Sequence, residues 1–304
     1  MNLESGRIDR NKCRNTSNLM KHHIFQNKSI LKILIFCLPV FILLSGSAFA
    51  IEDTLIEKDT GRLNSKHNFE ISAVYNYFEY SEPEVDIDIT GFMAGIKGKY
   101  TFCSTTGFIF SAELEYTYGL NTEYDGATWA GTPLNEDSKD WIVEPRLLTG
   151  GRLKLDEHFI INPYFGLGAR YWHNDIDGSG SYRRKTEYLY LPVGTNVTYK
   201  VSENFKWGVN LEFDIFLWGQ NRSYLSDSDP GFNDVKLDQD SGYGLRASLP
   251  FTYKSLQIEP YIYYWNINES DLEPLTYYGM PTGYDVYEPD NETTVYGIRL
   301  SFLF

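Results

Sequence analysis

One histidine, His173, is followed at close spacing by two aspartates, Asp175 and Asp177. An imidazole that a carboxylate orients can act as a general base and activate water at neutral pH. His173 with Asp175 or Asp177 is therefore the candidate for hydrolytic chemistry in this sequence. A histidine beside Trp172 and Asn174 is also typical of an exposed boundary position, so we predict no catalytic residue here.

Two acidic segments contain oxygen ligands of the kind that bind a divalent cation. Asp175 and Asp177 begin like a calcium-binding loop, but Thr186 stands where the bidentate Glu should close the loop. Asp227 and Asp229 precede a Pro-Gly pair, which is an ordinary composition for a turn. These four aspartates are weak metal candidates. Solvated acidic loops are the expected outcome, and no metal or other cofactor is predicted.

Charged residues also occur at every second position within several apolar segments. Nine cations and seven anions share this placement: Lys97, Lys99, Arg146, Arg152, Lys154, Arg170, Lys206, Arg246 and Arg299, with Glu70, Glu113, Glu115, Glu144, Glu212, Asp214 and Glu259. If they face one interior, opposite charges can pair there, whereas an isolated buried charge is costly. We predict a charge-filled lumen that acts as a structural plug. A narrow ion or solute path along the same residues is the alternative.

Only strands place alternate residues on opposite faces, so these charges require a β-sheet. Ten segments between Phe69 and Phe304 alternate an apolar face with a polar or small one, and the segment from Phe108 to Tyr118 does so most regularly. Five prolines fall inside the segments and predict local bulges or irregular pairing: Pro145, Pro163, Pro192, Pro250 and Pro260.

Connections between the ten segments alternate between tight and long. The tight links lie at residues 103–107, 156–158, 201–204 and 254–255, and the others run for roughly ten to twenty-five residues. Bacterial outer-membrane barrels have short periplasmic turns and long extracellular loops. The predicted fold is all-β, a transmembrane antiparallel up-and-down β-barrel over residues 66–304. Ten strands are expected, with eight or twelve as alternatives.

The N-terminal residues 1–50 have the features of a cleaved secretory signal. Lys28 precedes an apolar run from Ile30 to Leu44, and small residues then end in Ala48-Phe49-Ala50. The polar segment before Lys21 suggests Met20 as the true start. Residues 51–65 are expected to form a periplasmic segment before the barrel.

Composition after cleavage is strongly acidic. Removal of residues 1–50 takes away seven Lys or Arg and two acidic residues, which lowers the formal net charge from −14 to about −19. This charge disfavours nucleic acid as a partner. Cys103 remains as a single cysteine and cannot form an internal disulfide. The 24 tyrosines suit aromatic belts at membrane boundaries.

The chain ends in a strand with one apolar face, formed by Tyr296, Ile298, Leu300, Phe302 and the terminal Phe304. This tail resembles the C-terminal assembly signal of Gram-negative outer-membrane β-barrel proteins. The resemblance implies an integral protein of the outer membrane that the barrel-assembly machinery recognises. Outer-membrane lipid and lipopolysaccharide are the other expected partners.

The ten-strand layout with long outer loops resembles the omptin outer-membrane proteases over the whole barrel. That resemblance implies an Asp pair in the second outer loop and an Asp-His couple in the fourth. Here the second loop, 119–140, contains Asp125 and Asp140, but the fourth, 220–240, contains no histidine. Omptin-type proteolysis is not predicted. We expect a monomer with a surface-interaction or structural role. Restricted porin-like transport through a narrow channel, and an omptin-like or other outer-membrane enzyme, are the alternatives.

Overall fold

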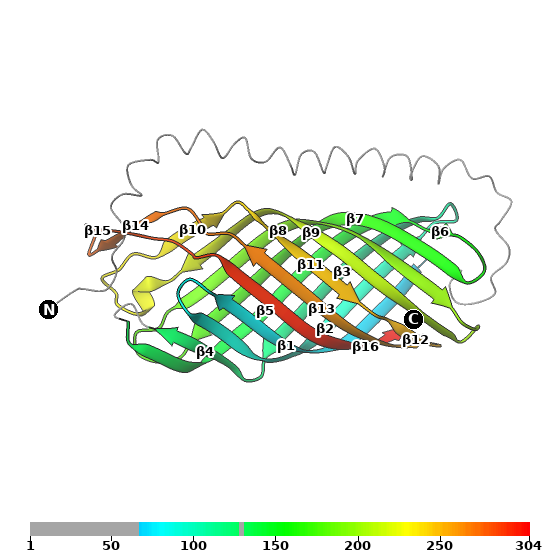
Figure 1. The fold of residues 1–304 in the computed structure, drawn as a ribbon, viewed down its shortest axis with the longest axis horizontal. Coiled ribbons are helices and arrows are strands. Elements are labelled where there is room, and N and C mark those ends of the chain that lie inside the picture. Colours follow the sequence, from blue (N-terminus) through cyan, green and yellow to red (C-terminus); the bar gives the residue numbers. More distant parts are fainter. Residues whose placement is uncertain (1–66, 128–130) are drawn as a thin grey trace, which may run out of the picture. The chain divides into compact units, whose positions relative to one another are not determined.

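The structure is a computed structural model that describes residues 67–127 and 131–304 (Figure 1). The predicted signal peptide and the segment 51–65 lie outside the described residues. Strands dominate the described part, which also contains the short 3-10 helix η3 (Leu225–Asp227). In these ranges no helix is both long enough and apolar enough to cross a membrane.

Ten antiparallel strand positions close into a barrel, as predicted. In order around the barrel they are β1 (His67–Glu82), β2 (Ile87–Cys103), β3 (Phe108–Gly119) with its continuation β4 (Thr122–Ala127), β5 (Pro133–Gly151) with β6 (Leu153–Lys154), β7 (Phe159–Ile176), β8 (Arg183–Lys200), β9 (Phe205–Ser223), β10 (Val235–Gln239) continued by β11 (Gly242–Ser248) and β12 (Phe251–Tyr253), β13 (Leu256–Ile267) and β16 (Asn291–Leu303). The first and last strands pair from Glu70↔Leu303 to Ser81↔Glu292, which closes the sheet.

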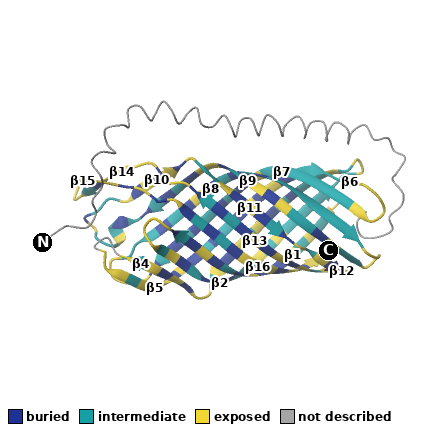
Figure 2. Cartoon of the chain, in the orientation of Figure 1, coloured by how far each residue is buried: buried dark blue, intermediate teal, exposed yellow. Residues whose placement is uncertain are grey.

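Alternation along each strand separates an outer surface from a lumen. In β3, Leu114 is 54% exposed, whereas its neighbour Glu113 is buried. The same alternation gives the strands their chequered pattern of buried and exposed residues (Figure 2). Because lipid surrounds the outward apolar side chains of such a barrel, they are buried in the membrane and leave the lumen to polar groups.

The four tight links are confirmed, but the outer connections are shorter than predicted. Residues 83–86 alone join β1 to β2, and β4 with the start of β5 occupies most of the segment expected as the second outer loop. Where the strands extend beyond the apolar belt, their outward positions become polar, as at Glu79, Asp88 and Glu123. Hydrophobic alternation does not detect strand extensions of this composition.

The last outer connection contains a separate hairpin, β14 (Glu273–Tyr277) and β15 (Met280–Val286). Tyr278 and Gly279 form its two-residue turn with φ of 48° and 76°, which is the positive pair that a type I′ turn requires. The hairpin packs on the segment after η3, where Phe232 bridges to Tyr277.

Proline makes the pairing locally irregular, as predicted. Pro250 interrupts a barrel strand between β11 and β12, the β5–β7 pairing skips Pro145, and the β7–β8 pairing skips Pro192. Pro163 and Pro260 are paired in register with β8 and β16. The one register shift recorded in the barrel pairs lies between Leu189 and Tyr190 of β8, opposite β9. As a result, two consecutive β9 residues, Leu217 and Trp218, are exposed outward.

Candidate functional site

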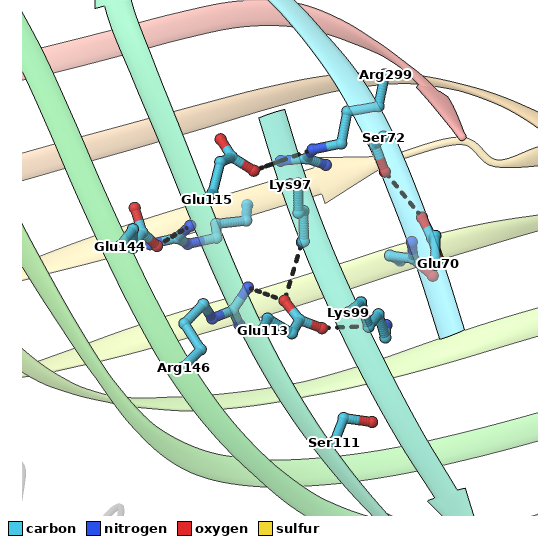
Figure 3. A network of polar contacts seen from close by, with 12 residues as sticks. Glu70, Ser72, Lys97, Lys99, Ser111, Glu113, Glu115, Glu144, Arg146 and Arg299 are labelled. Atoms are coloured by element: carbon cyan, nitrogen blue, oxygen red, sulfur yellow. Dashed lines mark hydrogen bonds and ion pairs between the residues drawn. The ribbon is translucent and has the colours of Figure 1, made fainter. Parts of the chain in front are cut away.

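A network of ion pairs fills the middle of the lumen. The Glu113 carboxylate of β3 forms ion pairs with Lys97 at 2.9 Å, Lys99 at 3.0 Å and Arg146 at 3.4 Å (Figure 3). Arg146 of β5 also pairs with Glu212 of β9. Since β7 and β8 separate β5 from β9 in the sheet, this last contact crosses the lumen.

Arg246 of β11 is the centre of the network. Its guanidinium lies 2.6 Å from Glu144, 3.2 Å from Glu212 and 2.5 Å from Asp214. Arg170 adds a second cation at Glu144, at 3.4 Å. Buried guanidinium groups with several carboxylate partners satisfy the charges that β-strand alternation places in the lumen.

A second cluster forms around Arg299 of β16, which pairs with Glu115 at 3.0 Å and with Glu259 at 3.5 Å. The guanidinium carbon lies 3.9 Å from the centroid of the Tyr261 ring, and Tyr263 also contacts the guanidinium. Cation–π contacts of this kind stabilise the guanidinium among the aromatic rings. Arg246 lies in the same way over Tyr190, Tyr263 and Trp265.

Four of the predicted lumen charges lie nearer the periplasmic end. Glu70 and Lys206 line two adjoining cavities of about 220 and 230 Å³, and Arg152 lines the second. Lys154 is exposed in β6. No ion pair within 4.0 Å connects Arg152, Lys154 or Lys206 to an acidic residue in the described part of the chain. Water can enter this half of the lumen.

An apolar and aromatic layer, absent from the sequence-based prediction, lies inside the barrel on the extracellular side of the ion pairs. Phe78 of β1 packs against Trp172 of β7 with ring centroids 5.3 Å apart, and Tyr80 packs against the same indole at 4.9 Å. Val74, Met93, Ile142 and Val295 complete the layer. A cavity of about 20 Å³ between the ion pairs and this layer has room for about one water. The sequence indicated this layer where consecutive residues are all apolar, as at residues 141–143, because one of them must then face the lumen.

Two buried polar clusters at the outer end were also missed. Asp140 accepts hydrogen bonds from Ser138 Oγ (2.5 Å), Trp172 Nε1 (2.7 Å) and Asn174 Nδ2 (2.9 Å). It is fully buried and therefore structural rather than a free loop carboxylate.

The second missed cluster joins β1, β8 and the segment before β16. Arg184 Nη1 lies 2.6 Å from Glu82 and 4.0 Å from Glu288. The Tyr80 hydroxyl contacts Glu82 Oε1 at 2.8 Å and Glu288 Oε1 at 2.9 Å. Burial and the adjacent Glu82 raise the pKa of the Glu288 carboxyl to about 7. These residues are distant in sequence, and only the basic run at Arg183 to Lys185 hinted at the cluster.

The candidate base and metal ligands do not assemble into a site. The His173 ring stacks on Trp141 with centroids 5.3 Å apart, and its sheet partner is Lys185. Asp177 pairs with Lys139 at 2.6 Å, and Asp175 faces Lys139 and Arg183 in the sheet register.

The acidic residues near η3 are also engaged within the protein. Arg183 donates two hydrogen bonds to the Asp227 carboxylate. Asp229 accepts hydrogen bonds from the backbone amide of Gly231 and the hydroxyl of Tyr277. Across residues 67–127 and 131–304, no group of three His, Cys, Asp or Glu side chains is arranged to hold a metal ion.

The predicted terminal signal lies on the outer surface of the closing strand. Tyr296, Ile298, Leu300, Phe302 and Phe304 are all exposed outward. The Phe304 amide donates to Phe69 O at 2.9 Å, and its ring packs against Phe302 with centroids 4.8 Å apart.

Cations gather on the outer surface near the extracellular rim. Arg183, Lys185 and Arg222 all lie over the ring of Tyr224, with cation-to-centroid distances of 4.8, 5.1 and 4.8 Å. Arg222 is paired in register with Lys185 on one side and Lys236 on the other. Arg183 has a carboxylate partner in Asp227.

A closed ten-stranded antiparallel barrel with an apolar outer belt defines an integral protein of the outer membrane. The chain belongs to the outer membrane protein beta-barrel domain family, which it matches over residues 36–239. No curated protein is significantly similar in sequence.

Among solved structures, the barrel is similar to the outer membrane protease OmpT of Escherichia coli, with a TM-score of 0.52 and 12% identity over 78% of this chain and 96% of that one. This similarity extends to the fold alone. The translocator domain of the autotransporter NalP from Neisseria meningitidis matches 85% of this chain and 94% of its own, at 8% identity and a TM-score of 0.41. The attachment invasion locus protein Ail of Yersinia pestis matches 79% of this chain and all of its own, at 8% identity and a TM-score of 0.32. The last two scores are too low to bear on the role.

Proposed function

We propose that this protein is a monomeric outer-membrane barrel with a non-conducting lumen, whose role in structure or surface interaction is exerted at its extracellular end. The observation that supports this most is the filled lumen. Ion pairs reach across it from β5 to β9 and β11, and the Phe78–Trp172 layer lies beyond them. One chain closes its own sheet, so no second copy is needed for a barrel.

Conductance in planar bilayers tests the closed lumen. The purified protein should give no stepwise conductance above the bare bilayer. Replacing Phe78 and Trp172 together by Ala should open the apolar layer and introduce small steps, whereas replacing the outward Tyr75 and Tyr77 by Ala should not. Regular steps from the unmodified protein would instead support the restricted-channel alternative.

We also propose that lipopolysaccharide or another phosphorylated lipid binds the Tyr224 cation cluster. Three cations share one aromatic ring and, among residues 67–127 and 131–304, Arg183 alone of the three forms an ion pair with a carboxylate, so a phosphate would relieve their mutual repulsion. Replacing Lys185 and Arg222 by Gln should reduce the thermal stabilisation by lipopolysaccharide at least twofold. Replacing Lys200, the last residue of β8, and the turn residue Lys254 by Gln is the charge-matched control. An equal loss in both double variants would contradict a specific site.

The enzyme alternative has a direct test of its own. Protein refolded with lipopolysaccharide should leave peptides with paired basic residues intact, because His173 stacks on Trp141 and no carboxylate of the described residues forms a hydrogen bond or ion pair with it. Cleavage that disappears in His173→Ala would make His173 catalytic and overturn the proposed role.

A further inference from the structure

The extracellular end of the barrel contains an amphipathic cavity of about 310 Å³. Its walls are mostly aliphatic and tyrosine side chains from the barrel rim and the loops, including Ile176, Leu225, Leu237 and Val286. Glu82, Arg184 and Glu288 are the charged groups in its lining. Apolar walls with a few convergent polar groups, at this volume, are typical of a small-molecule site.

The charged floor of this cavity has one carboxylate more than it has cations. Arg184 Nη1 is in contact with Glu82, at 2.6 Å, but stands 4.0 Å from Glu288. Glu288 is 6% exposed, so water compensates its charge poorly. An anionic ligand would be repelled by this excess negative charge, and a neutral ligand would not compensate it. A cation placed at Glu288 would neutralise it.

The number of hydrogen-bond donors in the floor of the cavity also favours a cationic ligand. The Tyr80 hydroxyl touches both carboxylates but has one proton to donate. If Tyr80 donates to Glu82, the second contact is satisfied by a protonated Glu288 that donates to the tyrosine oxygen. This matches the raised pKa of Glu288. A ligand ammonium can replace that proton, because it supplies both donors and positive charge.

The rim of the cavity is suited to the approach of a cation. Tyr124, Tyr182 and Tyr287 line the cavity, and aromatic rings attract cations. Burial and the nearby carboxylates of Glu84, Glu269 and Asp290 raise the pKa of the Tyr287 hydroxyl. Carboxylates close to a cavity raise the local concentration of cations.

We propose that this outer cavity binds a small hydrophobic amine, with the ammonium group between Glu82 and Glu288 and the apolar part among the aliphatic and tyrosine walls. The inference deepens the proposed surface role and rests on it, but the two are tested separately. Conductance measurements report on the lumen, and titration with an amine reports on the cavity.

Three ligands of matched size provide the main experiment, which needs no variant. Phenethylamine, phenethyl alcohol and hydrocinnamate are titrated calorimetrically into protein purified from outer membranes in a nonionic detergent at pH 8. The amine should bind saturably, at least about tenfold more tightly than the alcohol, and the carboxylate should not bind. No saturable amine binding, equal binding of amine and alcohol, or preferred binding of the carboxylate would overturn the proposal.

The competing proton gives a second readout. The titratable and charged groups that face Glu288 are Glu82 and Tyr80 of β1, Arg184 and Tyr188 of β8, and Tyr182 before β8. Amine affinity should fall about tenfold or more between pH 8 and pH 5.5, with proton release on binding at the lower pH. An affinity that is independent of pH would contradict an ammonium at Glu288.

A charge-matched pair of variants locates the site. Glu288→Gln should weaken amine binding at least about tenfold, whereas Glu273→Gln removes a carboxylate on the exposed β14 of the same connection and should leave it unchanged. Heat-modifiable migration on gels verifies that both variants are folded. Equal affinities of the two folded variants would place the amine elsewhere.

Discussion

Arg246 of β11 and Glu144 of β5 form an ion pair of 2.6 Å, although three strands, β7, β8 and β9, separate them in the sheet. The contact therefore joins distant parts of the barrel wall through its interior. Arg246 reaches Glu212 and Asp214 as well, so one guanidinium compensates three carboxylates. We infer that Arg246 is the residue on which the integrity of the lumen depends most.

Replacing Arg246 by Leu should destabilise the barrel strongly. The three carboxylates would lose their shared cation in a buried setting, and loss of one partner of a buried pair costs about 3–5 kcal/mol. Urea unfolding in lipid vesicles measures the loss, and Lys154→Leu, at an exposed cation of β6, is the control. A loss below about 1 kcal/mol for Arg246→Leu would indicate that water already solvates these carboxylates.

The facing of β9 can be tested at two neighbouring residues. Leu211 is 54% exposed on the lipid side, whereas Asn210 donates to Ser248 and Glu259 in the lumen. Leu211→Arg should cost about 2–4 kcal/mol of folding free energy in vesicles. Asn210→Arg should cost less, because Glu259 can pair with the new cation. Equal losses would contradict the assigned faces.

Deletion of Phe304 should reduce the amount of barrel in the outer membrane of cells several-fold. Its ring packs against Phe302 at the end of the chain, so refolding into detergent should lose about 1 kcal/mol or less. The difference between the two assays isolates recognition by the assembly machinery from strand stability. Quantitative immunoblots of outer-membrane fractions make the comparison. Normal levels of the deletion variant would show that Phe304 is an ordinary strand residue.

Strand number and facing could be predicted from the sequence because they depend on local alternation. The residue types of Leu114 and Glu113 alone indicate which side of the sheet each faces. The same holds for every strand, because lipid surrounds the outer side of the barrel. The same argument placed Glu113, Arg146 and Glu212 in the lumen before their partners were known.

Cross-lumen partners could not be predicted in this way. Which carboxylate Arg146 meets depends on barrel closure and strand register, which bring β5 opposite β9. The apolar layer was missed for a related reason: Phe78 and Ile142 lie on the lumen face, where alternation predicts polar residues. Glu82 and Glu288 are more than 200 positions apart, and no local pattern connects them.

Glu288 predicts a pH dependence of stability with a defined sign. Its pKa is raised to about 7 in the folded protein by burial, compared with about 4.3 for an ordinary glutamate. The folded state therefore holds a proton that the unfolded chain has released. This contribution is complete below about pH 4 and is lost as the pH rises through about 7.

Unfolding of the ligand-free protein in vesicles should show this dependence. Between pH 5 and pH 8 the free energy of unfolding of the unmodified barrel should fall by about 1 kcal/mol or more relative to that of Glu288→Gln. The Gln side chain cannot ionise, so the difference between the two pH profiles reports the Glu288 proton. Glu273→Gln, at an exposed position of β14, should follow the unmodified protein. Parallel pH profiles for Glu288→Gln and the unmodified barrel would show that Glu288 is ionised in the folded state, and would remove the proton from the floor of the outer cavity.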